Sequence, residues 1–126
     1  MTSREVSNSV RRLIVESIDT VSELEAILLL REHRDIEWTA DEAARRLYVS
    51  LAVSGHILNV LSKRGFLAES GKRYRYSPAT PALEAATEEL AGCYSRDLIA
   101  VTQLIHAKPT PSVLQFADAF RVRKDD

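Results

Sequence analysis

The chain of 126 residues contains one cysteine, four glycines and four prolines, and this scarcity limits the classes of protein it can belong to. A single cysteine, Cys93, excludes an internal disulfide and the paired cysteine spacing of zinc sites. We expect Cys93 to be a buried structural thiol, with a redox sensor as the less favoured alternative. No apolar run approaches about 18 residues, so no membrane-spanning helix is predicted. The first residues are too charged for a signal peptide, which favours a cytoplasmic protein.

Motifs for catalysis and cofactor binding are also missing. His33, His56 and His106 lie far apart, without the i, i+4 spacing of a metal-binding pair, so no metal site is predicted. Neither a glycine-rich phosphate loop nor a nucleophile elbow is present. We expect Trp38 to anchor the core or to act as a hydrophobic staple rather than to bind a ligand. The sequence therefore predicts no enzyme and no cofactor.

The length of the chain suits one domain. The charged residues are unevenly distributed along it. The formal net charge is −1, but residues 39–77 carry seven basic and three acidic residues and sum to +4. Residues 1–38 and 78–126 sum to −3 and −2. A local excess of positive charge is typical of a surface that binds phosphates. Because the enrichment is modest, chance clustering is the alternative interpretation.

Four helices are predicted in the first half of the chain, over residues 5–18, from 20 or 22 to 31, over 39–47 and over 50–64. Thr39 is followed three residues later by Glu42, the pattern of a capping box. Ser50 caps the fourth helix, and Gly65 stands where a left-handed residue ends it. The second helix is apolar on every side at residues 26–30, so we expect it to be the central core helix.

Two short strands follow, at residues 66–68 and 73–76, with a tight turn between them at 70–72. Together they form a hairpin over residues 66–77. Apolar residues then recur at spacings of three or four over residues 81–107, which predicts one long helix of about 40 Å.

The C-terminal extension, residues 81–121, is predicted to be helical and to mediate dimerisation. Apolar residues spread around the helix at 98–105, so one face can pack on the domain and the other on a second subunit. A last amphipathic helix is expected over residues 112–120. The predicted dimer contacts are Leu90, Tyr94, Leu98, Val101 and Ile105.

The segment TADEAARRLYVSLAVSGHILNVLSKRGFLAESGKRYRYSP, about a third of the chain, resembles the winged helix-turn-helix superfamily of small bacterial transcription regulators of the MarR and ArsR kind. The resemblance lies in the capping box, the Ala43-Ala44-x-x-Leu47 pattern, Ser50, the Leu58/Leu61 pair and the run of residues 64–67. It implies a mainly α single domain over residues 1–126, with N-terminal helices, a helix-turn-helix and β-wing at 39–77, and a long C-terminal dimerisation helix. Tyr48 stands where the turn usually has glycine, which predicts an altered turn or a slightly different angle between the two helices.

In such a fold the helix at 50–64 is the one that enters the major groove. We expect its buried face to carry Leu51, Ser54, Leu58 and Leu61, and the opposite stripe to carry Ala52, His56, Asn59 and Lys63. Asn59 can pair with adenine, and Lys63 can contact guanine or a phosphate. The alternative is an ordinary solvated helix face.

Basic residues of the wing and of the preceding helix complete the predicted interface. Lys72, Arg73 and Arg75 suit phosphate or minor-groove contacts, although charges also keep an edge strand soluble. Arg45 and Arg46 can clamp the DNA backbone. The full predicted DNA-binding set is Arg45, Arg46, Ser50, Ala52, His56, Asn59, Lys63, Lys72, Arg73 and Arg75.

The sequence thus favours a homodimeric DNA-binding transcription regulator that binds double-stranded DNA. The alternative is a winged-helix module that binds a protein partner and lacks sequence-specific DNA binding. A third hypothesis is a ligand sensor, with a pocket between the central helix and the long C-terminal helix. No group of residues in the sequence indicates a ligand class for such a pocket.

Overall fold

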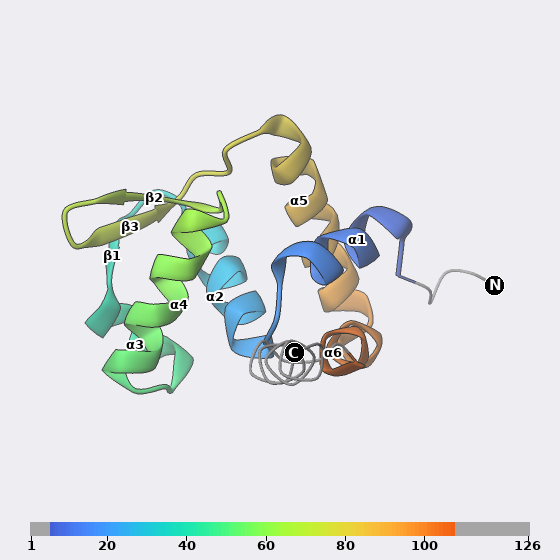
Figure 1. Cartoon of the computed structure of the whole chain (residues 1–126), viewed down its shortest axis with the longest axis horizontal. Coiled ribbons are helices and arrows are strands. Elements are labelled where there is room, and N and C mark those ends of the chain that lie inside the picture. Colours follow the sequence, from blue (N-terminus) through green and yellow to red (C-terminus); the bar gives the residue numbers. More distant parts are fainter. Residues whose placement is uncertain (1–5, 108–126) are drawn as a thin grey trace, which may run out of the picture.

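The computed structural model describes residues 6–107, which form six helices and one small antiparallel sheet (Figure 1). The elements in chain order are α1 (Asn8–Ser17), α2 (Val21–Glu32), β1 (Trp38–Thr39), α3 (Ala40–Leu47), α4 (Leu51–Lys63), β2 (Leu67–Ser70), β3 (Arg73–Tyr76), α5 (Pro81–Arg96) and α6 (Leu98–Ala107). The protein is therefore mainly α with a small β-hairpin, as predicted. The helix predicted at 112–120 lies outside the described residues.

Hydroxyl side chains fix the starts of most helices. The side chains of Ser7, Thr20, Ser50 and Thr80 each accept a hydrogen bond from the backbone N–H three residues later. Thr39 does the same and also completes the capping box, because its own N–H donates to the carboxylate of Glu42 at 2.9 Å. These bonds satisfy backbone donors that have no partner inside the helix. The predicted starts of the second, third and fourth helices are confirmed, with Thr20 as the cap of the second.

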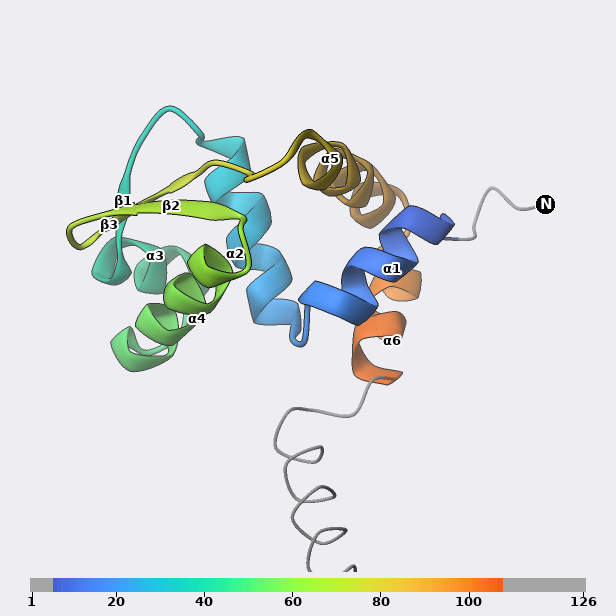
Figure 2. The ribbon, with the colours of Figure 1, turned by 45° about the horizontal axis from the view of Figure 1, so that its top comes forward.

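The helices fall into two groups around one continuous core. Figures 1 and 2 show α2, α3, α4 and the sheet on one side, and α1, α5 and α6 on the other. Leu24, Ile27 and Leu30 of α2 are completely buried, and Leu28 and Leu29 are partly buried against the same core. The central position predicted for this apolar helix is confirmed.

The sheet has the strand order β1-β3-β2. The hairpin of β2 and β3 was predicted, whereas β1 was not, because two residues carry too little pattern to be recognised. Trp38 pairs with Tyr74 and Thr39 with Arg73, so β1 fixes the start of α3 to the hairpin. Trp38 is only 4% exposed, and its predicted role as a core anchor is confirmed.

The single long helix predicted over residues 81–107 is wrong. The chain breaks at Asp97, which has φ −146° and ψ 73°, and α5 and α6 are separate helices. The carboxylate of Asp97 accepts a hydrogen bond from the N–H of Ala100 at 3.2 Å. Aspartate favours such capping bonds, so Asp97 ends one helix and starts the next.

The turn between α3 and α4 keeps a left-handed residue despite the absence of glycine. Tyr48 has φ 59° and ψ 45°, and the N–H of Val49 donates to the carbonyl of Ala44 at 3.2 Å. Of the two outcomes predicted for Tyr48, the altered turn is therefore wrong, because the tyrosine adopts the conformation that glycine usually supplies, whereas the different helix angle stays a prediction. Gly65, with φ 94°, takes the left-handed position predicted for it after α4.

Candidate functional site

Helix α4 packs on α2, α3 and β2 through Ser54, Ile57, Leu58 and Leu61. The hydroxyl of Ser54 donates to the carbonyl of Ala40 at 2.8 Å, which holds this face of α4 against the start of α3. The predicted buried face is correct except at Leu51. Leu51 lies in the first turn of the helix, before that contact, and is 58% exposed.

The stripe predicted to face DNA lies on the outer side of α4. Ala52, His56 and Lys63 are exposed, and Asn59 is half-buried. Ser50 differs from them, because its hydroxyl accepts from the N–H of Val53 at 3.1 Å and so caps the helix.

An apolar patch, which the sequence reasoning did not identify, surrounds the N-terminal end of α4. Tyr48 is 93% exposed, Leu51 58% and Val53 45%. The signal was present in the sequence as a bulky residue at the turn followed by Leu51, but Leu51 was assigned to the core. The outer side of α4 therefore combines a polar stripe with an apolar end.

The hairpin presents its cations on one face. Arg73 and Arg75 are exposed, whereas Tyr74 and Tyr76, which alternate with them along β3, are buried, as the alternation predicted. The register pairs Arg73 with Ser70 and Arg75 with Ala68, so the outer face around the arginines carries small side chains. Within residues 6–107, no salt bridge involves Lys72, Arg73 or Arg75. These three charges are therefore available to an external anion.

The Arg73 charge also reaches the start of α3. The hydrogen bond from the backbone of Thr39 lowers the pKa of the Glu42 carboxyl, and the nearby positive charges of Arg73 and Arg45 lower it further. Glu42 consequently stays ionised and keeps the capping box closed. The charge of Arg73 on the hairpin thus acts on Glu42 at the start of α3.

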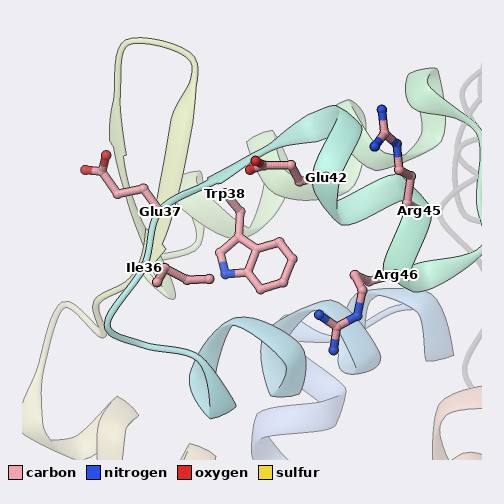
Figure 3. Close-up of a pocket in the computed structure, with 6 residues that line it drawn as sticks. All are labelled: Ile36, Glu37, Trp38, Glu42, Arg45 and Arg46. Carbon is pink, nitrogen blue, oxygen red and sulfur yellow. The ribbon is translucent and has the colours of Figure 1, made fainter.

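The two arginines of α3 point away from each other (Figure 3). Arg45 forms an exposed ion pair with Asp41 at 2.6 Å, one helical turn earlier. The guanidinium of Arg46 lies 5.6 Å from the centre of the Trp38 ring, a cation–π contact. Both line a hollow of about 350 Å³, the Trp38 hollow, together with Ile36, Glu37, Trp38 and Glu42.

One of the seven basic residues in the 39–77 segment is structural. Arg64 donates to the carboxylates of Asp19 at 2.9 Å and Glu23 at 3.1 Å, and to the carbonyl of Ser17 at 2.8 Å. Sequence reasoning missed this network, because its members are more than 40 residues apart in the chain. Six other basic residues of the segment are exposed: Arg45, Arg46, Lys63, Lys72, Arg73 and Arg75.

The predicted dimer contacts need correction. Leu90 and Val101 are completely buried and Ile105 is 1% exposed, so these three residues belong to the chain's own core. The break at Asp97 explains the burial of Val101 and Ile105, since α6 packs back on α5 and α1 instead of continuing outward. Leu90 lies before the break, in α5, which packs on α1. Leu98 remains 51% exposed, and its neighbour Ile99 is 65% exposed. Tyr94 is half-buried, and its hydroxyl donates to Glu25 at 3.5 Å.

The described part of the chain has one cysteine and no metal-binding cluster. Cys93 is a free thiol and is 5% exposed, which confirms the burial predicted for it. Among residues 6–107, no group of three or more His, Cys, Asp and Glu side chains is arranged to hold a metal ion. None of the helices in this range is both long enough and apolar enough to cross a membrane.

No protein-family model, curated protein or solved structure matches this chain.

Proposed function

We propose that this protein is a cytoplasmic, homodimeric transcription regulator that binds double-stranded DNA through a winged helix-turn-helix. The main support is one arrangement: α3, a left-handed turn and α4 lead directly into a hairpin whose outer face carries Arg73 and Arg75. In proteins of this type, the second helix enters the major groove and the hairpin contacts the backbone or the minor groove. The proposal includes no catalytic role and no cofactor.

Phosphate contacts account for most of the affinity in this proposal. Lys72, Arg73 and Arg75 are exposed and outside any ion pair in residues 6–107, so binding costs them no internal partner. Arg45 of α3 and Lys63 of α4 are also exposed and supply further positive charge. Base recognition falls to His56 and Asn59, which offer few donors and acceptors. We therefore expect strong salt dependence and modest sequence discrimination.

Dimerisation is proposed through the start of α6. Leu98 and Ile99 are adjacent, more than half exposed and apolar, which makes them the best candidates for contact with a second copy. A two-fold dimer would present two α4 helices to half-sites about one helical turn of DNA apart.

The test is fluorescence anisotropy with a random-sequence duplex and with DNA from upstream of the gene, across a salt series. Arg73→Ala/Arg75→Ala should weaken binding to both and reduce the slope of log K against log salt by about 2, since each phosphate contact contributes about 0.9. Arg11→Ala/Arg12→Ala is the matched control, because it removes the same charge from the exposed side of α1. Salt-insensitive or undetectable binding at low ionic strength, or equal slopes for the two variants, would contradict the proposal.

A protein-interaction module is the second candidate, and the apolar patch of Tyr48, Leu51 and Val53 favours it. Exposed aromatic and aliphatic side chains at the end of a recognition helix suit a protein surface better than base edges. In this case Val53→Asp should abolish the capture of a stoichiometric protein partner, whereas Arg73→Ala/Arg75→Ala should leave that capture intact. Capture of no stoichiometric protein partner by the unaltered chain would count against this second candidate.

A further inference from the structure

A second hollow of about 350 Å³ lies where the two groups of helices meet; we call it the Tyr94 hollow. It is lined by Glu25, Leu28, Leu29 and Glu32 of α2, by Arg46 and Leu47 of α3, by Tyr48 of the turn and by Tyr94 of α5. Its position between the central helix and the C-terminal helices is the one considered for a ligand pocket from the sequence. Unlike the sequence, the structure brings together side chains that define a ligand chemistry.

The lining combines apolar, aromatic and acidic groups. Leu28, Leu29 and Leu47 are partly buried hydrophobic residues packed against the core, and they can contact the apolar body of a ligand. Tyr48 and Tyr94 contribute two aromatic rings, whose faces attract cations.

The charges of the hollow also favour a cation. Glu25 and Glu32 contribute −2 and Arg46 contributes +1, which leaves a formal charge of −1. The Arg46 guanidinium is engaged by the Trp38 ring in the neighbouring hollow. Glu32 is the last residue of α2, where the helix dipole adds partial negative charge. The hollow is thus complementary to a single positive charge.

One wall of the hollow is already fixed. The Tyr94 hydroxyl donates to the Glu25 carboxylate at 3.5 Å, which links α5 to α2. Burial, and then the nearby charge of Glu25, raise the pKa of Tyr94, so its hydroxyl remains a neutral donor at physiological pH. Tyr48 on the other wall is 93% exposed and can lose accessible area when a ligand binds.

We propose that the Tyr94 hollow binds a small organic monocation with an apolar, partly aromatic body. The volume is at the lower end of the range for small-molecule sites, which suits a compact ligand. The two carboxylates supply charge recognition, and the two tyrosines and three leucines supply the contact area. The proposal does not depend on DNA binding, because the carboxylates, tyrosines and leucines that would contact the ligand are not among the residues proposed to contact DNA.

Two ions of nearly the same shape and opposite charge provide the test. Isothermal titration calorimetry of the unaltered chain with tetraphenylphosphonium should show saturable binding, and with the isosteric anion tetraphenylborate it should show binding at least about tenfold weaker. Equal or tighter binding of the anion would overturn the proposal, as would no binding of the cation. This comparison needs no variant and no DNA, so its outcome is separate from that of the regulator proposal.

Charge-only variants then assign the binding to the hollow. Glu25→Gln/Glu32→Gln should weaken tetraphenylphosphonium binding about tenfold, because it removes both carboxylates and keeps their shape. Glu16→Gln/Glu37→Gln makes the same change of net charge at exposed positions outside the hollow and should leave the affinity unchanged. Equal losses in the two double variants would show that the cation responds only to net charge and would refute the site.

Discussion

Arg64, at the C-terminal end of α4, forms a 2.9 Å ion pair with Asp19, which lies 45 residues earlier, between α1 and α2. The same guanidinium bonds to Glu23, whose side chain is only 9% exposed. This contact therefore fixes the end of the proposed recognition helix relative to the first two helices. It also explains why Arg64 is not available to an external anion.

Removing the Arg64 side chain should destabilise the fold. In Arg64→Ala the buried Glu23 carboxylate loses its cationic partner, and we expect a loss of about 2–3 kcal/mol in the free energy of unfolding. Arg45→Ala is the control, since it breaks an exposed ion pair with Asp41 and should cost at most about 0.5 kcal/mol. Urea denaturation followed by circular dichroism measures both. Equal costs for the two variants would show that the Arg64 network adds nothing to stability.

Tyr48 offers a test of backbone strain at the turn between α3 and α4. A non-glycine residue in the left-handed region costs about 1–2 kcal/mol, and glycine loses about 0.5–1 kcal/mol of chain entropy on folding. Tyr48→Gly should therefore raise the melting temperature and increase the free energy of unfolding by up to about 1 kcal/mol. Tyr48→Ala removes the ring but keeps the Cβ atom, so it should give no such gain. A Tyr48→Gly protein no more stable than Tyr48→Ala would disprove strain at this turn.

Local patterns were sufficient to predict most of the secondary structure. The hydroxyl caps at Thr39 and Ser50 and the left-handed Gly65 each act within a few residues, and the structure has all three as expected. The break at Asp97 was also encoded locally, because the aspartate side chain caps α6 by accepting a hydrogen bond from the N–H three residues later, that of Ala100. It was missed because the apolar spacing continues across the break, and periodicity alone does not detect a change of helix direction.

Features that depend on distant partners were not predictable in the same way. The sequence gives no sign that Arg64 would turn toward Asp19, or that Trp38 would pair with Tyr74 in a third strand. The burial of Ile105 depends on where α6 packs, which the broken helix decides. For the candidate site, the outward positions of Arg73 and Arg75 followed from alternation along one strand. The hollow that joins Glu25 to Tyr94 required side chains of α2 and α5 to meet, as they do in the bond between Tyr94 and Glu25.

Glu88 should make stability depend on pH. The side-chain hydrogen bond from Arg31 lowers the pKa of the Glu88 carboxyl below its ordinary 4.5, and a second bond from Arg34 lowers it further. The folded state then binds fewer protons than the unfolded state, so this contribution is present above pH 4.5 and is lost as the pH falls through the lowered pKa. Because the carboxylate is 40% exposed, we expect at most about 1 kcal/mol at neutral pH.

The measurement is urea denaturation of the unaltered protein and Glu88→Gln at pH 7 and at pH 3. The difference in unfolding free energy between the two proteins should be largest at pH 7 and should shrink at pH 3. In an Arg31→Gln/Arg34→Gln background, Glu88→Gln should have little effect at either pH, because the cations that lower the pKa are gone. A difference that stays constant with pH would contradict the assigned cause.

Truncation of two isoleucines of α6 should have very different effects on the stability of the fold. Ile105 is 1% exposed, so Ile105→Ala leaves a cavity and should cost about 2–5 kcal/mol of stability. Ile99 is 65% exposed, and Ile99→Ala should change the stability of the isolated chain by less than about 0.5 kcal/mol. Thermal and urea unfolding at low protein concentration measure both. A large cost at Ile99 alone would reverse the assignment of the two faces of α6.

The exposed face at the start of α6 predicts where a dimer would form. Light scattering after size exclusion should give a dimer at about 100 μM, and Ile99→Asp should give a folded monomer, because a carboxylate in an apolar interface is costly while an exposed one is not. Ile36→Asp is the control, because it introduces the same charge at a half-exposed isoleucine between α2 and β1, away from α6. The Ile36→Asp protein should remain dimeric. A monomeric unaltered protein would remove the dimer from the proposal. If Ile99→Asp instead remains dimeric, the contact lies on another face, and the half-site spacing expected from this face no longer holds.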